Sequence, residues 1–234
     1  MIEKQVSRIR VGKTEMSFPH QGNILTAVHP FYGPANSRTL QSLIRKDGLK
    51  EPTSAELASF VHEYFNGNEP QAKEVTQIMK DRYFRGFTGI LYVPDQKLAH
   101  FINYPEFDED SCVDTKNLLQ RIGESYANVP FEHLKGDLVD WREVGKHPYF
   151  VAWAGSQEGA EKLAELASKH PKKQVSIFVP NVSNLKEPTS RVAGLNSRRN
   201  GSRLDVVSDN HGDSEGSSSF GVLEKSAGGT RAEK

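Results

Sequence analysis

Cysteine is almost absent from this chain of 234 residues, in which Cys112 is the single example. A lone cysteine excludes disulfide bonds within the chain, which small secreted domains commonly use as staples. It also excludes zinc sites built on cysteine pairs. Nothing in the surrounding sequence marks this thiol as a catalytic nucleophile. The cysteine content therefore predicts a protein made in a reducing compartment.

Long apolar runs and a net charge are also missing. No stretch approaches the roughly 20 apolar residues that a membrane-spanning helix needs. Residues 1–5 lack the basic region and the apolar run of a signal peptide. We therefore expect no membrane insertion, and a location in the cytoplasm or on a virion or cell surface reached by another route. Lys plus Arg and Asp plus Glu both total 30, so no overall field favours nucleic acid.

Residues for catalysis or metal binding do not cluster in the sequence. The eight histidines are scattered and form neither an H-x-H pair nor an H-E-x-x-H motif. Two acidic groups are weak calcium candidates: the run from Glu106 to Asp110, and the set Asp205, Asp209 and Asp213. The run lacks the glycine and carbonyl spacing of a calcium loop, so a solvated loop is favoured. We predict that the chain is not an enzyme and needs neither a cofactor nor a metal, with a hydrolase of unrecognised fold kept as an alternative.

Two short motifs resemble nucleotide- or RNA-binding sequences but fail at a required position. Gly12-Lys13-Thr14 ends like a phosphate-binding loop, yet Ser7 stands where that loop needs a glycine, so a hairpin turn is favoured. Residues 85–92 partly match an RNA-recognition strand, but Gly89 stands where a stacking aromatic is required. We interpret the aromatics of this stretch as core and its arginines as snorkelling. No nucleic-acid partner is predicted, and residues 82–87 remain an alternative contact patch.

The rest of the chain predicts short strands and helices joined by long loops, which is typical of an α+β fold. A capping box at Thr53 and Glu56 and an N-cap at Ser156 mark two helix starts. Helices are predicted over residues 54–65, 69–83, 114–122 and 155–168. Strands are predicted over residues 87–93, 98–102, 149–154 and 175–179, and a hairpin over residues 6–18 with its turn at Gly12-Lys13.

The most informative stretch is residues 196–219, where 20 of the 24 residues are Asn, Ser, Arg, Gly, Asp or His. Such a composition is typical of disorder, but Leu204, Val206 and Val207 lie inside it and Phe220 to Leu223 follow it. Lys, Glu, Gln, Met and Trp make up 50 of the 234 residues, yet Glu215 alone represents them here. Codons that end in a pyrimidine cannot encode these five types. The bias indicates a segment filled by variation at the nucleotide level.

This segment resembles the variable proteins of diversity-generating retroelements. The motifs that carry the resemblance cover the last 45 residues: Arg191-x-x-Gly194-Leu195, residues 196–201, Arg203-Leu204-x-Val206, Gly212-Asp213 and Phe220-Gly221-Val222. The resemblance implies one C-type lectin-like domain of the formylglycine-generating-enzyme type, although the cysteine pair of that enzyme is absent. It divides the chain into a scaffold (residues 1–190), a variable ligand-binding region (residues 191–223, called the C-terminal segment below) and a tail (residues 224–234). It also implies that the first strand, Val6–Val11, pairs with Phe220–Leu223.

The resemblance further implies a non-enzymatic binding protein whose partner is a macromolecule, with a protein surface on another cell or virus preferred. Leu204, Val206, Phe220 and Val222 are predicted to be buried anchors, and Gly201, Gly212 and Gly221 are assigned to turns. The predicted contact residues are Arg198, Arg199, Asn200, Ser202, Asp205, Ser208, Asp209, Asn210, His211 and Ser214. Arg198, Arg199 and His211 are the expected hot spots. The alternative is a structural or interaction protein with a disordered polar C-terminal tail.

Overall fold

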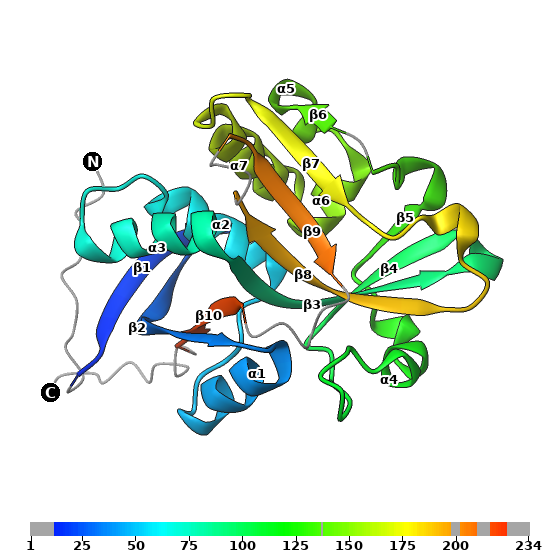
Figure 1. Ribbon diagram of the computed structural model, residues 1–234, viewed down its shortest axis with the longest axis horizontal. Coiled ribbons are helices and arrows are strands. Elements are labelled where there is room, and N and C mark those ends of the chain that lie inside the picture. The colour runs from blue at the N-terminus through cyan, green and yellow to red at the C-terminus, as the bar shows by residue number, and fades with distance from the viewer. Residues whose placement is uncertain (1–11, 137, 198–201, 210–215, 224–234) are drawn as a thin grey trace, which may run out of the picture.

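The computed structural model describes residues 12–136, 138–197, 202–209 and 216–223, and its centre is a mixed β-sheet (Figure 1). The sheet order is β1-β2-β10-β3-β8-β9-β7-β6, with β4 paired to β3 and β5 paired to β4. The strands are β1 (Thr14–His20), β2 (Asn23–Ala35), β3 (Tyr83–Val93), β4 (Leu98–Asn103), β5 (Ala127–Pro130), β6 (Leu138–Asp140), β7 (Gln174–Phe178), β8 (Thr189–Asn196), β9 (Leu204–Asp209) and β10 (Ser217–Val222). Strands β9 and β10 and most of β8 belong to the C-terminal segment, and all three lie inside the sheet beside strands from the scaffold.

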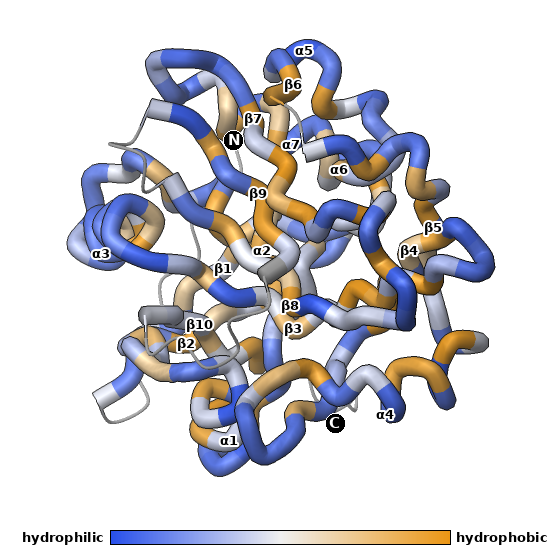
Figure 2. Tube along the Cα trace, turned by 45° about the vertical axis from the view of Figure 1, so that its right-hand side comes forward, coloured by the Kyte–Doolittle hydropathy of each residue, from blue (hydrophilic) through white to orange (hydrophobic). Residues whose placement is uncertain are grey.

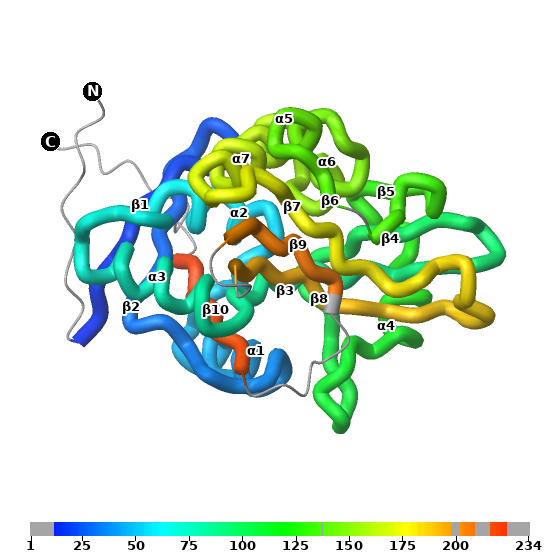
Figure 3. Tube along the Cα trace, turned by 45° about the horizontal axis from the view of Figure 1, so that its top comes forward, coloured from blue at the N-terminus to red at the C-terminus, as the bar shows by residue number. Residues whose placement is uncertain are grey.

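Helices cover this sheet on both sides. They are α1 (Ser37–Lys46), α2 (Ser54–Tyr64), α3 (Pro70–Asp81), α4 (Thr115–Gln120), α5 (Trp141–Val144), α6 (Pro148–Trp153) and α7 (Gln157–Ser168). Short 3-10 turns lie at η1 (Pro94–Gln96), η2 (Ile122–Glu124), η3 (Phe131–His133) and η4 (Val182–Asn184). Figure 3 shows α5, α6 and α7 on one side of β7, β9 and β8, with α1 and α4 toward the other side.

The main hydrophobic core lies between the sheet and helices α2, α3, α6 and α7. Apolar residues follow the strands at the middle of the molecule, whereas hydrophilic residues follow its outer turns (Figure 2). Phe60 and Phe84 pack there against Phe220 of β10, with ring centroids 4.3 and 5.8 Å from the Phe220 ring. Two smaller clusters lie under α1 and α4. The C-terminal segment is thus part of the main core.

The capping signals identify their helices correctly. In the capping box of α2, the Glu56 amide donates to the Thr53 hydroxyl (3.2 Å) and the Thr53 amide donates to the Glu56 carboxylate (2.7 Å). The Ser156 hydroxyl accepts from the Gly159 amide (3.0 Å) at the start of α7. These bonds satisfy backbone donors that the first turn of a helix leaves unpaired. The helices predicted over residues 54–65, 69–83, 114–122 and 155–168 are confirmed as α2, α3, α4 and α7.

The strand predicted over residues 149–154 is wrong, because this stretch forms helix α6. Pro148 occupies the first helical turn, and the His147 ring accepts from the Tyr149 amide (3.3 Å) as an N-cap. Tyr149, Phe150 and Trp153 are buried. When a short apolar run is buried on several sides, its hydrophobic residues show neither the period of a strand nor that of a helix. Periodicity therefore cannot decide between the two structures.

The N-terminal hairpin lies further along the chain than predicted. Strands β1 and β2 meet at a two-residue turn, Gln21-Gly22, where both residues have positive φ (46° and 75°). Such a pair of left-handed residues matches the twist of a hairpin, and glycine adopts it without strain. The last strand, β10, pairs with β2, with Gly221 opposite Val28. The predicted strand Val6–Val11 lies outside the described residues.

The four predicted anchors of the C-terminal segment are confirmed. Leu204, Val206 and Phe220 are fully buried, and Val222 is 2% exposed. Leu204 and Val206 lie opposite Val175 and Ile177 of β7 in the parallel β7–β9 ladder. Because these side chains fill the core, the strands on either side of the polar stretches have fixed positions.

Candidate ligand-binding face

Strands β7, β9, β8 and β3 lie side by side and present alternate side chains to opposite faces of the sheet. Val175 and Ile177 point into the main core, so Ser176 and Phe178 belong to the other face. The registers place further residues on that same face, which we call the outer face: Leu138 of β6, Asp205 and Val207 of β9, Gly194 and Asn196 of β8, and Arg85 of β3.

Two connections of the C-terminal segment leave and rejoin the sheet at the ends of strands β8, β9 and β10. The first connection, residues 198–201, joins β8 to β9, and the second, residues 210–215, joins β9 to β10. The Ser197 amide donates to the Met79 carbonyl (2.6 Å), and the Ser202 carbonyl accepts from the Lys172 amide (2.9 Å). The Tyr83 amide donates to the Gly216 carbonyl (3.4 Å). Backbone hydrogen bonds to α3, β3 and the turn after α7 therefore fix the points where the connections leave the sheet.

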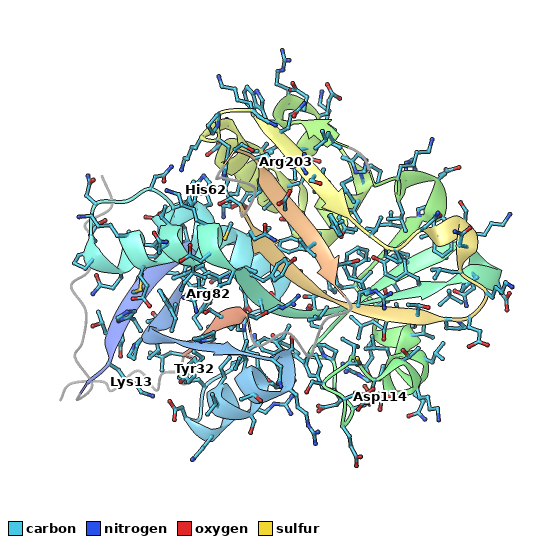
Figure 4. The ribbon with its side chains drawn as sticks, in the orientation of Figure 1. Lys13, Tyr32, His62, Arg82, Asp114 and Arg203 are labelled. Carbon is cyan, nitrogen blue, oxygen red and sulfur yellow. The ribbon has the colours of Figure 1, made fainter. Side chains whose placement is uncertain are left out.

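A buried ion pair lies at the start of β9. The Arg203 Nε atom is 3.1 Å from a carboxylate oxygen of Asp205, and the two side chains are 10% and 6% exposed. Figure 4 shows Arg203 at the end of β9 that is nearer α7. Two opposite charges so far out of water must stay paired, because separating them would leave an uncompensated buried charge. This pair is a structural feature of the face.

A second buried cation lies on the outer side of β3. Arg85 is fully buried, and its Nε atom donates to the Ser217 hydroxyl (2.9 Å) at the start of β10. Its guanidinium carbon lies 5.0 Å from the centre of the Tyr83 ring. A Cβ atom on Gly194 would lie 3.3 Å from the Arg85 Nη1 atom, so glycine leaves room for this side chain. Arg85 thus ties β3 to β10.

This geometry corrects the interpretation of residues 82–87. Phe84 and Phe87 are fully buried, so the prediction that the aromatics belong to the core is confirmed. Arg85 does not snorkel to the surface, because its guanidinium is held at Ser217 and Tyr83. Arg82, labelled in Figure 4, follows α3 and is partly buried. A contact patch built on exposed Arg85 and Phe87 is therefore excluded.

The predicted contact residues fall into three groups. Six of them lie outside the described residues, in the two connections: Arg198, Arg199, Asn200, Asn210, His211 and Ser214. Ser202 is partly buried beside the first connection, and Asp209 ends β9 opposite Val192. The exposure expected for Asp205 and Ser208 is wrong, because these side chains are only 4% exposed.

Strand alternation explains the burial of Ser208. Ser208 shares the inner side of β9 with Leu204 and Val206, and its hydroxyl lies 2.5 Å from the Tyr92 hydroxyl. Burial raises the pKa of Tyr92, so its phenol stays neutral and remains available for this hydrogen bond. The L-x-V-x-S spacing in the sequence already contained this signal, because residues two apart on a strand share a face.

The turn assigned to Gly221 is also wrong. Gly221 lies within β10, opposite Val28 of β2, and its φ is not in the left-handed region. A Cβ atom there would collide with Leu49 Cδ1 and lie 2.8 Å from Leu49 Cβ. Glycine is therefore needed for the close approach of the segment after α1. Gly201 and Gly212 lie outside the described residues.

The surroundings of the first connection are basic. Burial lowers the pKa of His170, which is 3% exposed, and the charges of Lys169 and Lys80 lower it further. The hydrogen bond to the Leu166 carbonyl and the charge of Asp205 act in the opposite direction. The exposed lysines at the end of α3 and after α7 therefore lie close to the start of β9.

The described part of the chain offers little to a metal or a membrane. It contains no group of three or more His, Cys, Asp or Glu side chains placed to hold a metal ion. Asp205 is engaged by Arg203, and Asp213, the third member of the predicted calcium set, lies outside the described residues. Within the same ranges, no helix is long and apolar enough to cross a membrane.

Comparison with known proteins identifies the fold. No protein-family model matches the chain, and no curated protein matches its sequence. The structure is similar to a solved structure of a C-type lectin fold that accommodates massive sequence variation in Nanoarchaeota. The TM-score is 0.56 at 11% sequence identity, and the match covers 81% of this chain and 94% of that chain. This α+β protein has a C-type lectin fold.

Proposed function

We propose that this chain is a non-enzymatic binding protein that presents changeable side chains on a stable lectin-type scaffold. The observation that carries the proposal is the position of the two polar connections. Each one starts and ends at a strand that buries side chains in the main core, where that strand leaves the sheet. Binding residues are often located on loops that a rigid framework positions in this way.

The arrangement separates stability from recognition. Leu204, Val206 and Phe220 supply core packing, whereas the codon bias of residues 196–219 indicates variation at polar positions. Exposed substitutions typically change stability by about 0.5 kcal/mol or less, so many sequences in the connections are compatible with one backbone. A scaffold of this kind suits the variable region of a diversity-generating retroelement.

The contact residues that we propose lie in or beside the two connections. Arginine and histidine present planar groups with several hydrogen-bonding atoms, and arginine is enriched at interface hot spots. Asparagine and serine add adaptable hydrogen bonds, as they do in antibody loops. Burial removes Asp205 and Ser208 from the set, which leaves Arg198, Arg199, Asn200, Ser202, Asp209, Asn210, His211 and Ser214.

The partner that we propose is a macromolecule, with a protein surface on another cell or virus preferred. The two connections begin at opposite ends of β9, a strand of six residues that spans about 20 Å. Contacts spread over this length suit an extended surface better than a small molecule. The similar solved structure concerns a fold that accommodates massive sequence variation, which supports a display role for this chain.

The alternative of a disordered polar tail does not fit strands β9 and β10. Both strands pair with scaffold strands and bury apolar side chains, so residues 204–209 and 217–222 belong to the sheet. A linker would make no such contacts. A purely structural role without a selected ligand remains the competing function, and it predicts that the sequence of the connections is irrelevant to partner choice.

An exchange of the two connections tests the proposal. We expect that replacing residues 198–201 and 210–215 by the corresponding residues of a sister protein changes the set of captured partners. The melting temperature should move by no more than about 2 °C, since the exchanged positions are all polar residues or glycine in the sequence. Affinity capture from the native community, followed by mass spectrometry, compares the two proteins.

The matched control changes polar residues on α4, for example Lys116→Ser with Gln120→Ser, and should leave the partners as they are in the wild type. Identical partners for the wild type and the exchange variant would contradict the proposal and place binding elsewhere on the protein.

A further inference from the structure

Two exposed apolar side chains lie next to the C-terminal segment but outside it. Phe178 of β7 is 52% exposed and Leu138 of β6 is 49% exposed, the largest values among the large hydrophobic side chains of the described ranges. Leu138 lies opposite Ser176, two residues before Phe178, so the two side chains are diagonal neighbours on the outer face. Single exposed hydrophobics are common, whereas contiguous exposed apolar surface marks interaction sites.

This apolar patch is continuous with the C-terminal segment. Phe178 is the register partner of Val207 in the β7–β9 ladder, and both side chains belong to the outer face. Val207 is 3% exposed and belongs to none of the three core clusters. Leu138 and Phe178 therefore form a small exposed apolar patch near the sheet edge, and the buried Val207 lies next to it in β9, the strand that the proposed contact region adjoins.

Lysines surround the other end of β7. Lys172 and Lys173 precede this strand, Lys169 precedes them after α7, and Lys80 lies at the end of α3; all four are exposed. None of the four forms an ion pair with another described residue, although the Lys169 ammonium donates to the His62 carbonyl (3.5 Å). Two neighbouring acids are already engaged: Asp205 pairs with Arg203, and Asp140, the register partner of Gln174, pairs with Arg142. Within the described ranges, the four ammonium groups near this end of the strand therefore have no carboxylate partner.

We infer that β7, with Leu138 beside it and the lysines near its start, forms a part of the binding face that stays constant when the connections vary. This part binds an acidic protein surface from which an apolar side chain protrudes. The inference rests on the proposed function, because the contacts on β7 would accompany the variable contacts that the two connections make with the same partner. Lys173 and Phe178 are separated by about 17 Å along the strand, so one partner segment reaches both. The lysines steer acidic partners toward the face, and Phe178 supplies a desolvated anchor.

Random displayed peptides of about 12 residues provide a probe, since an extended chain of that length reaches about 40 Å. Selection on the full-length wild-type protein should enrich peptides with a large apolar residue close to Asp or Glu. The affinity of an enriched peptide is then measured by surface plasmon resonance for Phe178→Ser and for its matched control Leu119→Ser. Leu119 is 38% exposed on α4, away from β7.

We expect Phe178→Ser to weaken binding about tenfold or more and Leu119→Ser to have no effect. The double variant Lys172→Gln/Lys173→Gln should slow association severalfold at low salt, and the difference should vanish near 0.5 M salt because the lysine charges are then screened. Lys73→Gln/Lys116→Gln is the charge-matched control. Equal affinities for Phe178→Ser and Leu119→Ser would overturn the inference.

The exchange of the two connections separates this inference from the proposed function. Binding that is lost in the exchange variant but kept in Phe178→Ser supports the proposed function and rejects a constant part on β7. Binding that is lost in Phe178→Ser alone keeps β7 as a binding surface and counts against the changeable connections. Sedimentation of the wild type as a dimer and of Phe178→Ser as a monomer would show that the patch joins two copies, and would overturn the assigned partner class.

Discussion

Replacing Phe220 by alanine is expected to lower the free energy of unfolding by about 3–5 kcal/mol, because it removes a fully buried aromatic ring and leaves a cavity. The ring packs against Phe60, Phe84 and Phe18, with centroids 4.3, 5.8 and 6.1 Å away. These three residues come from α2, β3 and β1, so the loss extends through the main core. Urea denaturation of the wild type and Phe220→Ala measures the difference.

The matched variant changes the polar positions Arg198, Asn200, Asn210 and Ser214 together. Ser208 is left out because its hydroxyl lies within hydrogen-bonding distance of the buried Tyr92 phenol. We expect the free energy of unfolding to change by only about 0.5 kcal/mol per position at most. A polar set as damaging as Phe220→Ala would contradict the separation of core anchors from a tolerant display surface.

Asp205→Ala is expected to destabilise the protein by about 3–5 kcal/mol, although Asp205 lies in the segment proposed to vary. The substitution leaves the Arg203 guanidinium buried without its carboxylate partner, and an unpaired buried charge is costly. The combined variant Arg203→Met/Asp205→Leu removes both charges and should recover most of the lost stability. Chemical denaturation of the wild type, Asp205→Ala and the combined variant measures this difference.

The ion-pair account would be contradicted if Asp205→Ala differed from the wild type by less than about 0.5 kcal/mol, the range of ordinary surface positions. The same result would return Asp205 to the list of exchangeable contact residues. Loss of stability in Asp205→Ala with recovery in the combined variant would place Asp205 among the positions that the fold constrains.

Capping signals in the sequence predict the starts of two helices. Thr53 with Glu56 and Ser156 place the starts of α2 and α7 correctly. Helix α1 was not predicted, although Asn36 caps it by accepting from the Thr39 amide (2.8 Å). Its apolar positions Leu40 and Ile44 are spaced by one helical turn, but polar residues dominate the rest. Helix α6 was wrongly predicted as a strand for the opposite reason, because a run of buried apolar residues is compatible with either a strand or a helix.

The binding face could be predicted only in part. The alternation of Leu204, Val206 and Ser208 identifies the inner side of β9 from sequence alone. The neighbours of β9 cannot be read in this way, because pairing with β7 and β8 depends on contacts between distant parts of the chain. The burial of Arg85 at Ser217, and the place of Phe178 beside Val207, are consequences of that long-range pairing.

Amide hydrogen exchange on the intact protein tests the central claim most directly, namely that the C-terminal segment is held in the sheet while its connections are presented for binding. We predict slow exchange for the paired amides of β9 and β10, comparable with that of β3, because these strands share the main core. Mass spectrometry of overlapping peptides resolves the segment. Uniformly fast exchange from Asn196 to Leu223 would contradict both the lectin-type scaffold of this segment and the proposed binding face.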